Sequence, residues 1–509
     1  MARFVHNILS IKHRFCAKHI LHHTWRFNMD YLSSEHIMRV LNAFNPWWST
    51  GTVRPEFAKT YERFAFHEAL NLLNHKTIRR TVILTGTRRV GKTTIQYQII
   101  NELLKSGVNP ARIVYISLDH PLLKLSNLGD IMNAYHDHIY GDEDCYYFFD
   151  EVQYAADWDG WVKTIYDMRP LSRTVATGSA SPVLKEKTAE SGAGRSSIIQ
   201  VPTLSFYEYC EILDVERQDI PKDIKPSDLI NYPKRELTLL MNKLSGIKKY
   251  FNRYLLVGGF PALALADDDL MAQTIMREDV VDKVLKRDIP SLYNIRNATE
   301  LERIFLYLCY HSSNIISVDT ISKELNGVSR TTVDDYINYM ESANLIYKSL
   351  PVNMGGKKIL KAQSKIYIAD AAIRNAVLMD GNLLTNPDEM GITVETAVYK
   401  HIAAFYYQKT TSVGYYRQGK KGNEIDVVVD YPGGKTLIEV KYREKVIIDE
   451  KDAIYKLADE ANCAIVVTKL DDDFGIQPSG GSKPILRIPA FAFLYLLGNA
   501  EKHGYRGAK

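Results

Sequence analysis

The residues best suited to chemistry stand in one glycine-rich segment. Residues 86–93, GTRRVGKT, fit the pattern GxxxxGK[ST] between an apolar stretch and an amphipathic run. The glycines permit a tight loop whose backbone N–H groups converge on phosphate oxygens at the positive end of a helix. Lys92 would bridge the β- and γ-phosphates, and Thr93 would supply a hydroxyl to Mg²⁺. The predicted nucleotide-binding residues of this loop are Gly86, Thr87, Arg88, Arg89, Val90, Gly91, Lys92, Thr93 and Thr94.

A pair of carboxylates follows a later apolar stretch, Tyr146 to Phe149. If that stretch is a strand beside the phosphate loop, Asp150 lies where it can hold Mg²⁺ through water, together with Thr93. Glu151 then lies where it can orient an attacking water as a catalytic residue. Because the pair is coupled to the loop, it favours hydrolysis of a nucleoside triphosphate over mere storage.

Three further features of this part have more than one interpretation. Ser179 follows the apolar stretch Arg173 to Thr177, where it either senses the γ-phosphate or caps a helix. Arg195 is either a catalytic arginine that reaches the nucleotide of a neighbouring subunit or a solvated loop residue. The first interpretation of Arg195 requires a homo-oligomer. At least one of Arg88 and Arg89, which stand inside the phosphate loop, is expected to meet phosphate or acidic residues of a lid.

The last part of the chain carries a second candidate site. Glu395 stands in a helical stretch, Asp426 in a strand, and Glu439-x-Lys441 in the next strand, after a Pro-Gly-Gly turn. Strand side chains alternate, so the hairpin can bring Asp426 and Glu439 to one divalent ion. Lys441 would stabilise an attacking hydroxide, and Glu395 would complete the site. Surface ion pairs, each worth about 0 to 1 kcal/mol, would explain the same charges.

The elements that must position these residues alternate in type. Apolar strands at 82–85, 113–118, 145–149 and 173–177 alternate with helical patterns. Such alternation implies parallel βαβ crossovers and a doubly wound α/β domain. Residues 207–296 are mainly helical and are interpreted as a lid on that core.

Residues 301–350 are again mainly helical, and the series 316–367 reads as helix, turn, helix and a two-stranded wing. Ser329 would cap the second helix, whose exposed candidates for DNA contact are Arg330, Thr331, Thr332 and Tyr336. The basic wing, which would contact DNA phosphates, consists of Lys357, Lys358, Lys361 and Lys365. Asp334 and Asp335 on the same helix would repel DNA, so an interdomain scaffold of the same fold is the alternative.

These motifs, in this order, resemble one known family: prokaryotic, often archaeal, AAA+-related P-loop ATPases with a C-terminal domain of unknown function. The resemblance rests on TGTRRVGKTT, FFDEVQ, ATGSAS, VPTLSFYEY, VGGFP and KRDIPSLY. It implies ATP binding and hydrolysis, a winged-helix segment and a C-terminal region similar to PD-(D/E)XK nucleases. Asp426, Glu439 and Lys441 match the acidic and lysine positions of that nuclease pattern, and Glu395 matches its helix acid. Ile425 replaces the usual proline before the first Asp.

The expected fold is therefore an α/β P-loop NTPase, AAA+-like, with a helical lid, a winged-helix segment and a restriction-endonuclease-like α/β domain. The expected parts are an N-terminal extension (1–44), the ATPase core (45–206), the lid (207–298), the winged-helix-like domain (299–385) and the nuclease-like domain (386–509). ATP and Mg²⁺ are the expected cofactors, and DNA is the expected partner of a homo-oligomer. The alternative is a nucleotide-controlled switch that recruits a protein partner and carries an inactive nuclease-like domain.

The amino-acid composition limits which classes of protein the chain can belong to. The chain has 64 Lys and Arg against 60 Asp and Glu, so its charge does not indicate a nucleic-acid coat protein. Its five cysteines are scattered without metal-ligand spacing, which favours the reducing cytoplasm. The apolar stretch 489–497 is too short to span a membrane and predicts a buried helix. Residues 1–29 lack Asp and Glu, as in a transit peptide or an upstream extension before a start at Met29.

Overall fold

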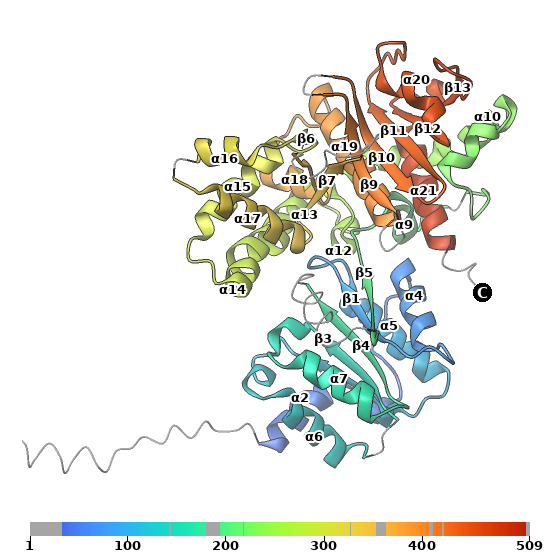
Figure 1. Cartoon of the computed structure of the whole chain (residues 1–509). Helices are drawn as coiled ribbons and strands as arrows, with labels where there is room; N and C mark the ends of the chain where they lie inside the picture. The colour runs from blue at the N-terminus through green and yellow to red at the C-terminus, as the bar shows by residue number, and fades with distance from the viewer. Residues whose placement is uncertain are drawn as a thin grey trace, which may run out of the picture.

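The first part of the chain folds around a five-stranded parallel sheet, drawn in blue to green in Figure 1. The computed structural model describes residues 33–141, 144–179, 194–216, 218–325, 327–352, 363–406, 411–419 and 422–504. The strands are β1 (Thr81–Thr85), β2 (Ile113–Ser117), β3 (Tyr146–Asp150), β4 (Arg173–Gly178) and β5 (Ser196–Gln200). Their order is β2-β3-β4-β1-β5, and every neighbouring pair is parallel. The predicted α/β core with a parallel sheet is confirmed.

Helices cover both faces of this sheet, which is why its strands read as continuous apolar runs. Val82 and Leu84 belong to the same buried cluster as α4 (Phe64–Leu73) and α5 (Lys92–Lys105). Ile83, which points to the opposite face, packs in the cluster of α2 (Ser34–Phe44), α6 (Leu128–His138) and α7 (Trp158–Met168).

Helix α2 corrects the expected boundary of the N-terminal extension at residue 44. Its apolar stripe, which includes Ile37 and Leu41, is buried against the α/β unit. Directly after the helix, the Asn45 side chain donates to the carbonyl of Tyr115 at 2.9 Å and accepts from the Tyr115 N–H at 2.6 Å. The α/β unit therefore includes α2. Residues 1–32, with the expected leader and Met29, lie outside the described residues.

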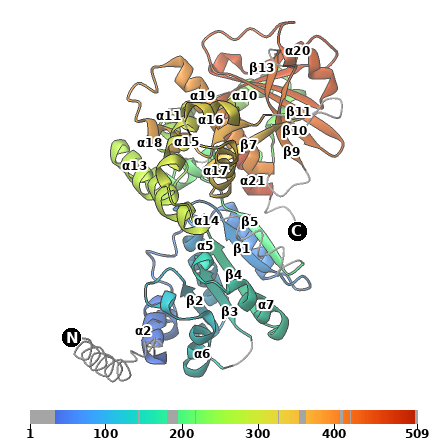
Figure 2. The ribbon, with the colours of Figure 1, turned by 60° about the vertical axis from the view of Figure 1, so that its left-hand side comes forward.

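The expected lid is a set of short helices that follows the sheet. They are α9 (Phe206–Ile212), α10 (Lys234–Leu244), α11 (Phe251–Val257), α12 (Pro261–Ala264), α13 (Asp269–Met276) and α14 (Ile289–Tyr293). Two π-helical segments, η6 (Arg277–Asp282) and η7 (Val284–Asp288), join α13 to α14 in one continuous helical run. This run lies above the carboxyl edge of the five-stranded sheet (Figure 2).

The next segment contains the predicted pair of helices followed by two strands, together with a short strand that was not predicted. It contains α15 (Ala298–Tyr310), β6 (Asn314–Ile315), α16 (Val318–Glu324), α17 (Arg330–Ser342), β7 (Ile346–Pro351), β8 (Lys365–Ile368) and α18 (Ala371–Leu378). Three residues of the expected basic wing, Lys357, Lys358 and Lys361, lie outside the described residues. The fourth, Lys365, is 2% exposed in β8, so its assignment to an exposed wing was wrong.

The remaining strands extend that small sheet instead of forming a separate one. They are β9 (Ser412–Arg417), β10 (Glu424–Tyr431), β11 (Gly434–Lys441), β12 (Cys463–Thr468), β13 (Gly475–Gln477) and β14 (Ile485–Pro489). The combined order is β13-β14-β12-β11-β10-β9-β7-β8-β6, and the two groups join where β7 pairs with β9. Helices α19 (Pro387–Tyr406) and α20 (Ala453–Leu457) accompany these strands.

The final helix, α21 (Ala490–Gly504), connects this sheet to the rest of the molecule. The predicted burial of 489–497 is confirmed, because every residue from Ala490 to Leu497 is buried. Helix α21 packs on α9, α19 and α4, and one buried apolar cluster runs from Trp47 to Ala500. Among the described residues, the structure has no helix with the length and apolarity that a membrane crossing requires.

Candidate functional site

The predicted phosphate loop stands between the end of β1 and the start of α5. Gly86 has a φ of 154°, and a Cβ there would lie 2.3 Å from the carbonyl oxygen of Val201, so only glycine fits. Gly91, with a φ of 97°, precedes α5. The ammonium of Lys92 lies inside the loop and donates to the carbonyls of Gly86 at 2.9 Å and Thr87 at 3.0 Å. Burial lowers the pKa of Lys92, although Glu151 and Asp150 oppose this change.

The structure brings together the two residues that were predicted to hold Mg²⁺. The Thr93 hydroxyl donates to Asp150 Oδ2 at 2.9 Å. Asp150 also accepts from the Tyr115 hydroxyl at 2.7 Å and from the hydroxyl of Thr177. Burial and the neighbouring Glu151 raise the pKa of Asp150. A divalent ion beside Thr93 and Asp150 would find the oxygen ligands that Mg²⁺ prefers.

Gln153 is a site residue that the sequence analysis missed. Its amide donates to the carboxylate of Glu151 and, at 3.0 Å, to the hydroxyl of Ser179. Glu151 itself has a left-handed backbone with a φ of 56°, and its N–H donates to Thr177 Oγ1 at 3.0 Å. The amide thus links the predicted water-orienting carboxylate to Ser179. Gln153 is the last residue of the segment FFDEVQ, two positions after Glu151, but no role was predicted for it.

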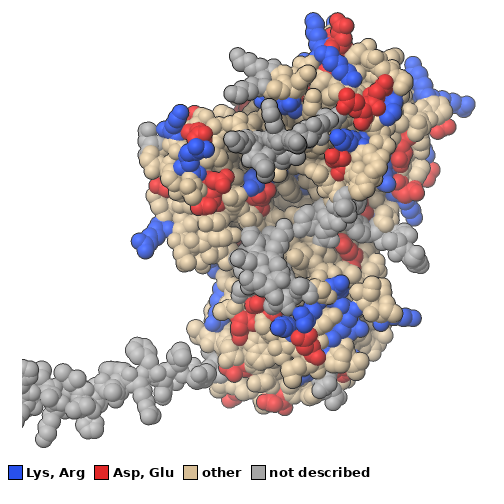
Figure 3. Space-filling view, viewed as in Figure 1, with Lys and Arg blue, Asp and Glu red and all other residues tan. Residues whose placement is uncertain are grey.

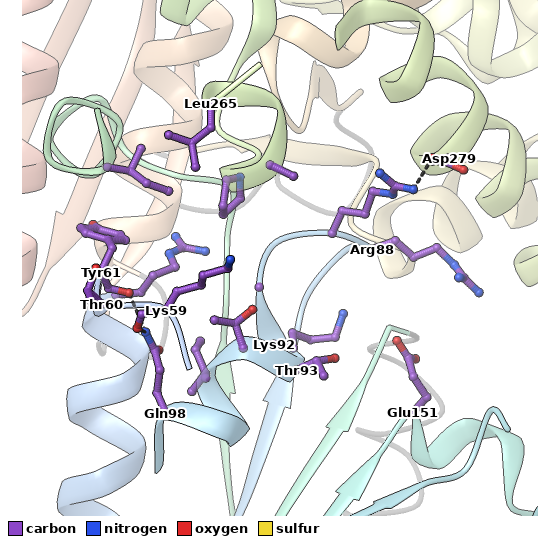
Figure 4. A pocket seen from close by; sticks show the side chains of 18 of the residues that line it. Lys59, Thr60, Tyr61, Arg88, Lys92, Thr93, Gln98, Glu151, Leu265 and Asp279 are labelled. Carbon is purple, nitrogen blue, oxygen red and sulfur yellow. Dashed lines mark hydrogen bonds and ion pairs between the residues drawn. The ribbon is translucent and has the colours of Figure 1, made fainter. Parts of the chain in front are cut away.

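These residues border a cavity of about 660 Å³ (Figure 4). Lys92, Thr93, Thr94 and Glu151 line it on the side of the sheet. The predicted loop residues Arg88, Arg89 and Gly91 also line it. Lining residues that were not predicted come from α5, from the loop before α4 and from the lid, and they include Gln98, Lys59, Thr60, Tyr61, Ile212, Pro261, Ala262, Leu265, Asp279 and Lys283. The amide of Gln98 holds the loop in place by donating to the carbonyls of Lys59 and Tyr61, each at 2.6 Å.

The two arginines of the phosphate loop contact acidic residues of the lid, which was one of the two predicted outcomes. Arg88 forms a two-pronged ion pair with Asp288, with Nη2 2.8 Å from Oδ1, and also donates to the Tyr154 hydroxyl at 3.0 Å. Arg89 pairs with Asp279. The loop is therefore joined directly to η6 and η7 of the helical run above it.

A third arginine joins the loop to the start of the lid, and the sequence analysis did not identify it. Arg63 donates to the carbonyl of Val90 at 3.0 Å and to that of Pro202 at 2.8 Å. Its other nitrogens bind both oxygens of Glu208 on α9, at 3.0 and 2.9 Å. Burial opposes ionisation of Glu208, but the attraction of Arg63 prevails and lowers the pKa of this carboxyl.

Arg195 does not reach the phosphate loop of its own chain. It stands directly before β5, whose first residue pairs with Thr81 at the amino edge of the sheet, whereas the loop follows the carboxyl edge. Its guanidinium pairs with Asp167 at 3.0 Å and lies over the ring of Tyr166. Any catalytic role for Arg195 therefore requires a second copy of the chain.

The second candidate site is occupied by a lysine that was not expected there. Lys365 Nζ lies 2.8 Å from Glu395 Oε1, 2.7 Å from Glu424 Oε1 and 3.0 Å from Asp426 Oδ1. The Tyr367 hydroxyl also donates to Glu395, at 2.9 Å. Burial would lower the pKa of Lys365, but the surrounding carboxylates raise it well above its ordinary value. Burial and Asp426 raise the pKa of Glu395 to about 7.

The predicted metal pair of Asp426 and Glu439 lines one cavity of about 630 Å³, but the two carboxylates are engaged elsewhere. Asp426 Oδ2 accepts from the N–H of Val440 at 2.9 Å, and Glu439 pairs with Lys441 at 2.8 Å. Burial raises the pKa of Glu439 to about 7, against the effect of Lys441. Within the described part of the chain, no three His, Cys, Asp or Glu side chains are grouped to hold a metal ion. In this structure the carboxylates predicted to hold a divalent ion are instead bonded to protein N–H groups and lysines.

The helix that was expected to face DNA differs from the prediction at one residue. Ser329 caps α17 as predicted, with its hydroxyl 3.0 Å from the N–H of Thr332. Tyr336, however, is only 9% exposed, because it lies on the face of α17 that packs into the core. Arg330 is exposed and pairs with Asp319 at 2.7 Å.

Three parts of the chain match known families. Residues 78–210 match an AAA domain, residues 248–383 match a domain of unknown function (DUF8612), and residues 390–491 match another (DUF4143). Together with the phosphate loop and the parallel sheet, the first match supports an AAA-related P-loop domain at residues 78–210. The expected combination of such a domain with a C-terminal domain of unknown function is confirmed.

Relatives and solved structures add little about function. An uncharacterized protein of Methanocaldococcus jannaschii is 27% identical over 372 residues, which cover 71% of this chain and 74% of the relative. A Haemophilus influenzae relative, also uncharacterized, is 25% identical over 302 residues, 57% of this chain and 68% of the relative. The ORC2 protein of Aeropyrum pernix aligns with 62% of this chain and 92% of its own, at 14% identity and a TM-score of 0.33. So low a score says nothing about function.

Proposed function

We propose that this protein hydrolyses ATP with Mg²⁺ and couples the nucleotide state to the position of its helical lid. The observation that carries the proposal is the convergence of Lys92, Thr93 and Glu151 on one cavity, with Asp150 bonded to Thr93. The loop amides and Lys92 would bind the phosphates, Thr93 and Asp150 would hold Mg²⁺, and Glu151 would orient the attacking water. Lys92 would exchange its two bonds to loop carbonyls for bonds to phosphate oxygens.

The other end of the cavity supports a purine ring as its occupant. Tyr61, Ile212, Pro261 and Leu265 give it an apolar lining, and flat aromatic ligands bind in such pockets. Figure 4 shows Leu265 across the cavity from Lys92. Since Ile212, Pro261 and Leu265 belong to the lid, base binding would draw the lid toward the sheet.

ATP turnover by purified Lys92→Ala tests this proposal. The variant should lose turnover because it lacks the cation that the transferred phosphoryl group needs, and chelation of Mg²⁺ should do the same to the wild type. Lys105→Ala, at the exposed end of the same helix, is the matched control and should keep the wild-type rate. Wild-type turnover by Lys92→Ala would refute the assignment.

The proposed task of the lid movement is to reposition a DNA-binding segment. The element order from α15 to β8 is that of a winged helix, and α17 begins with exposed Arg330 and Thr331. A homo-oligomer is part of this proposal, since only a neighbouring copy could receive Arg195. The test measures ATP turnover with single-stranded, duplex and branched DNA while following the DNA for cuts. Stimulation without cuts would support remodelling, whereas cuts that need Asp426 and Lys441 would support a nuclease.

A second candidate function is a nucleotide-controlled switch that recruits a protein partner. Asp334 is exposed on α17, and Asp319 pairs with Arg330, so acidic groups accompany the cations that would contact phosphates. On the face drawn in Figure 3, the coloured basic and acidic side chains are interspersed. DNA binding that weakens steeply as salt is added would count against this candidate, because such a slope reports the release of counterions from phosphates.

A further inference from the structure

Lys365 stands at the centre of the carboxylate cluster that the nuclease comparison would assign to a divalent ion. Its side chain is 3% exposed, and its ammonium lies within 3.0 Å of Glu395, Glu424 and Asp426. An ammonium has three N–H donors, and here three carboxylates are in reach of them. Each N–H donor of the Lys365 ammonium can therefore be paired with a carboxylate, and the cluster is a buried ionic network, unlike an incidental surface ion pair.

This contact depends on the curvature of the nine-stranded sheet. Lys365 belongs to β8, and Asp426 belongs to β10, with β7 and β9 between them. Three strand spacings in a flat sheet amount to about 14 Å, which is beyond the reach of a lysine side chain. The sheet must therefore curl between β7 and β9 to bring the ammonium to the carboxylates. The hydroxyl of Tyr415 on β9 supports the curl by donating to the carbonyl of Gln363 at 2.8 Å, just before β8.

The cluster does not fit a divalent ion in this arrangement. Both Asp426 oxygens have partners, Lys365 and the N–H of Val440, and Glu395 is bound by Lys365 and Tyr367. In this cluster, Oε2 of Glu439 is the one buried oxygen among the described residues that has no hydrogen-bond partner. A hard divalent ion takes about six oxygen ligands, some of them water, and it would have to compete with the Lys365 ammonium for the carboxylate oxygens.

The geometry points to Lys365 as a built-in cation that takes the place of the divalent ion and ties the winged-helix-like segment to the last part of the chain. Two lysines are paired with these carboxylates, Lys365 with Asp426 and its neighbours and Lys441 with Glu439 and Asp452. The site is then a permanent joint between β8, α19 and β10. Metal-dependent DNA cleavage at this cluster would require the Lys365 ammonium to leave the carboxylates. This inference goes beyond the proposed ATPase and does not depend on it.

Metal binding by Lys365→Met tests the inference. Mn²⁺ is titrated into the nucleotide-free full chain, with bound metal followed by electron paramagnetic resonance and the thermal midpoint followed in parallel. In the wild type, Asp426→Asn should remove no Mn²⁺ binding, because the carboxylate cluster should hold no Mn²⁺ there. Lys365→Met should gain a Mn²⁺ site, because its carboxylates lose their cation, and Mn²⁺ should raise its thermal midpoint. Asp426→Asn in that background should remove the site, and Lys348→Met, on the neighbouring strand β7, should behave as wild type.

Two results would overturn the inference. One is a Mn²⁺ site in the wild type that Asp426→Asn abolishes, and the other is a folded Lys365→Met that gains no site. If Lys365→Met does not fold even with Mn²⁺, the double variant Lys365→Gln/Glu424→Gln removes one charge of each sign and is measured in the same way. Failure of that variant to bind Mn²⁺ also overturns the inference. Turnover of ATP by the same variants should stay at the wild-type rate, which separates this test from that of Lys92.

Discussion

Asp150 shows how much one residue of the nucleotide site depends on its neighbours. It accepts hydrogen bonds from Thr93, Tyr115 and Thr177, which come from three different elements of the α/β unit. These donors fix the carboxylate beside the first turn of α5, where Mg²⁺ would bind with the phosphates. At the same scale, Gln153 fixes Glu151 by a bond that also reaches Ser179.

We predict that Gln153→Ala lowers kcat for ATP by about 10- to 100-fold with little change in KM. The reason is that Glu151 loses the donor that aims it, while the phosphate-binding loop is left intact. Steady-state kinetics check this, with Gln218→Ala as the control because that side chain bonds to the backbone of Glu216 outside the cavity. An unchanged kcat would mean that the bond does not orient Glu151.

At the scale of elements, the helical run from α13 to α14 is held to the phosphate loop by two ion pairs of different burial. Arg88 and Asp288 are 20% and 11% exposed, whereas Arg89 and Asp279 are 41% and 22% exposed. Water screens an exposed pair, so its contribution is small, but breaking a buried pair leaves a charge without compensation. The Arg88 pair is therefore the main connection between loop and lid.

We expect Arg88→Ala to release this helical run. Amide hydrogen exchange in residues 269–293 should rise clearly in Arg88→Ala and only slightly in Arg89→Ala, where the lost pair is worth about 1 kcal/mol or less. A double-mutant cycle with Asp288→Ala should give a coupling energy of about 1 to 3 kcal/mol. Equal amide exchange in Arg88→Ala and Arg89→Ala would show that the Arg88 pair is not the main connection between loop and lid.

At the scale of elements, Lys400 on α19 should make the free energy of unfolding depend on pH. This buried residue of α19 donates to the carbonyl of Leu204 and to the Tyr254 hydroxyl, and burial lowers its pKa to about 8 from 10.5. Between these values the unfolded chain binds more protons than the folded chain, so this group raises the free energy of unfolding as pH increases from about 8 to 10.5. The rise should be about 3 kcal/mol at most.

Comparison of the wild type with Lys400→Met isolates that contribution. Subtracting the two curves of unfolding free energy against pH removes the titration of the other lysines and the tyrosines. The difference should slope upward between pH 8 and 10.5 and be flat near pH 7. A flat difference throughout would show that the pKa of Lys400 is not lowered.

At the scale of the whole molecule, the two sheets share one core. The buried cluster that begins near Trp47 continues through α9 and α21 to the strands of the second sheet. Helix α21 also carries Lys502, which pairs with Glu211 on α9. Parts that share so much buried apolar surface are expected to unfold together.

Calorimetry should therefore show one unfolding transition for the full chain. Leu494→Ala removes a fully buried side chain from α21 and should cost about 2 to 5 kcal/mol, shifting that whole transition to lower temperature. The exposed Leu239→Ala on α10 is the control and should leave the midpoint nearly unchanged. Two transitions, of which Leu494→Ala moved only one, would show separate cores.

The sequence by itself determined the parts that depend on local pattern. The phosphate loop, the parallel strands, the cap at Ser329 and the buried last helix are each specified by residues within one or two turns or strands of one another. Short-range periodicity and turn chemistry report these features directly.

Only the tertiary structure decided which distant residues meet. Asp288 lies 200 positions from Arg88, and Lys365 lies 61 positions from Asp426, so neither pairing leaves a local signal. Lys365 looked like a wing residue because a lysine among other lysines is usually solvated, but the curl of the sheet buries it among carboxylates. Such contacts depend on how all the helices and strands pack together in the core, and no single segment of the sequence determines that packing.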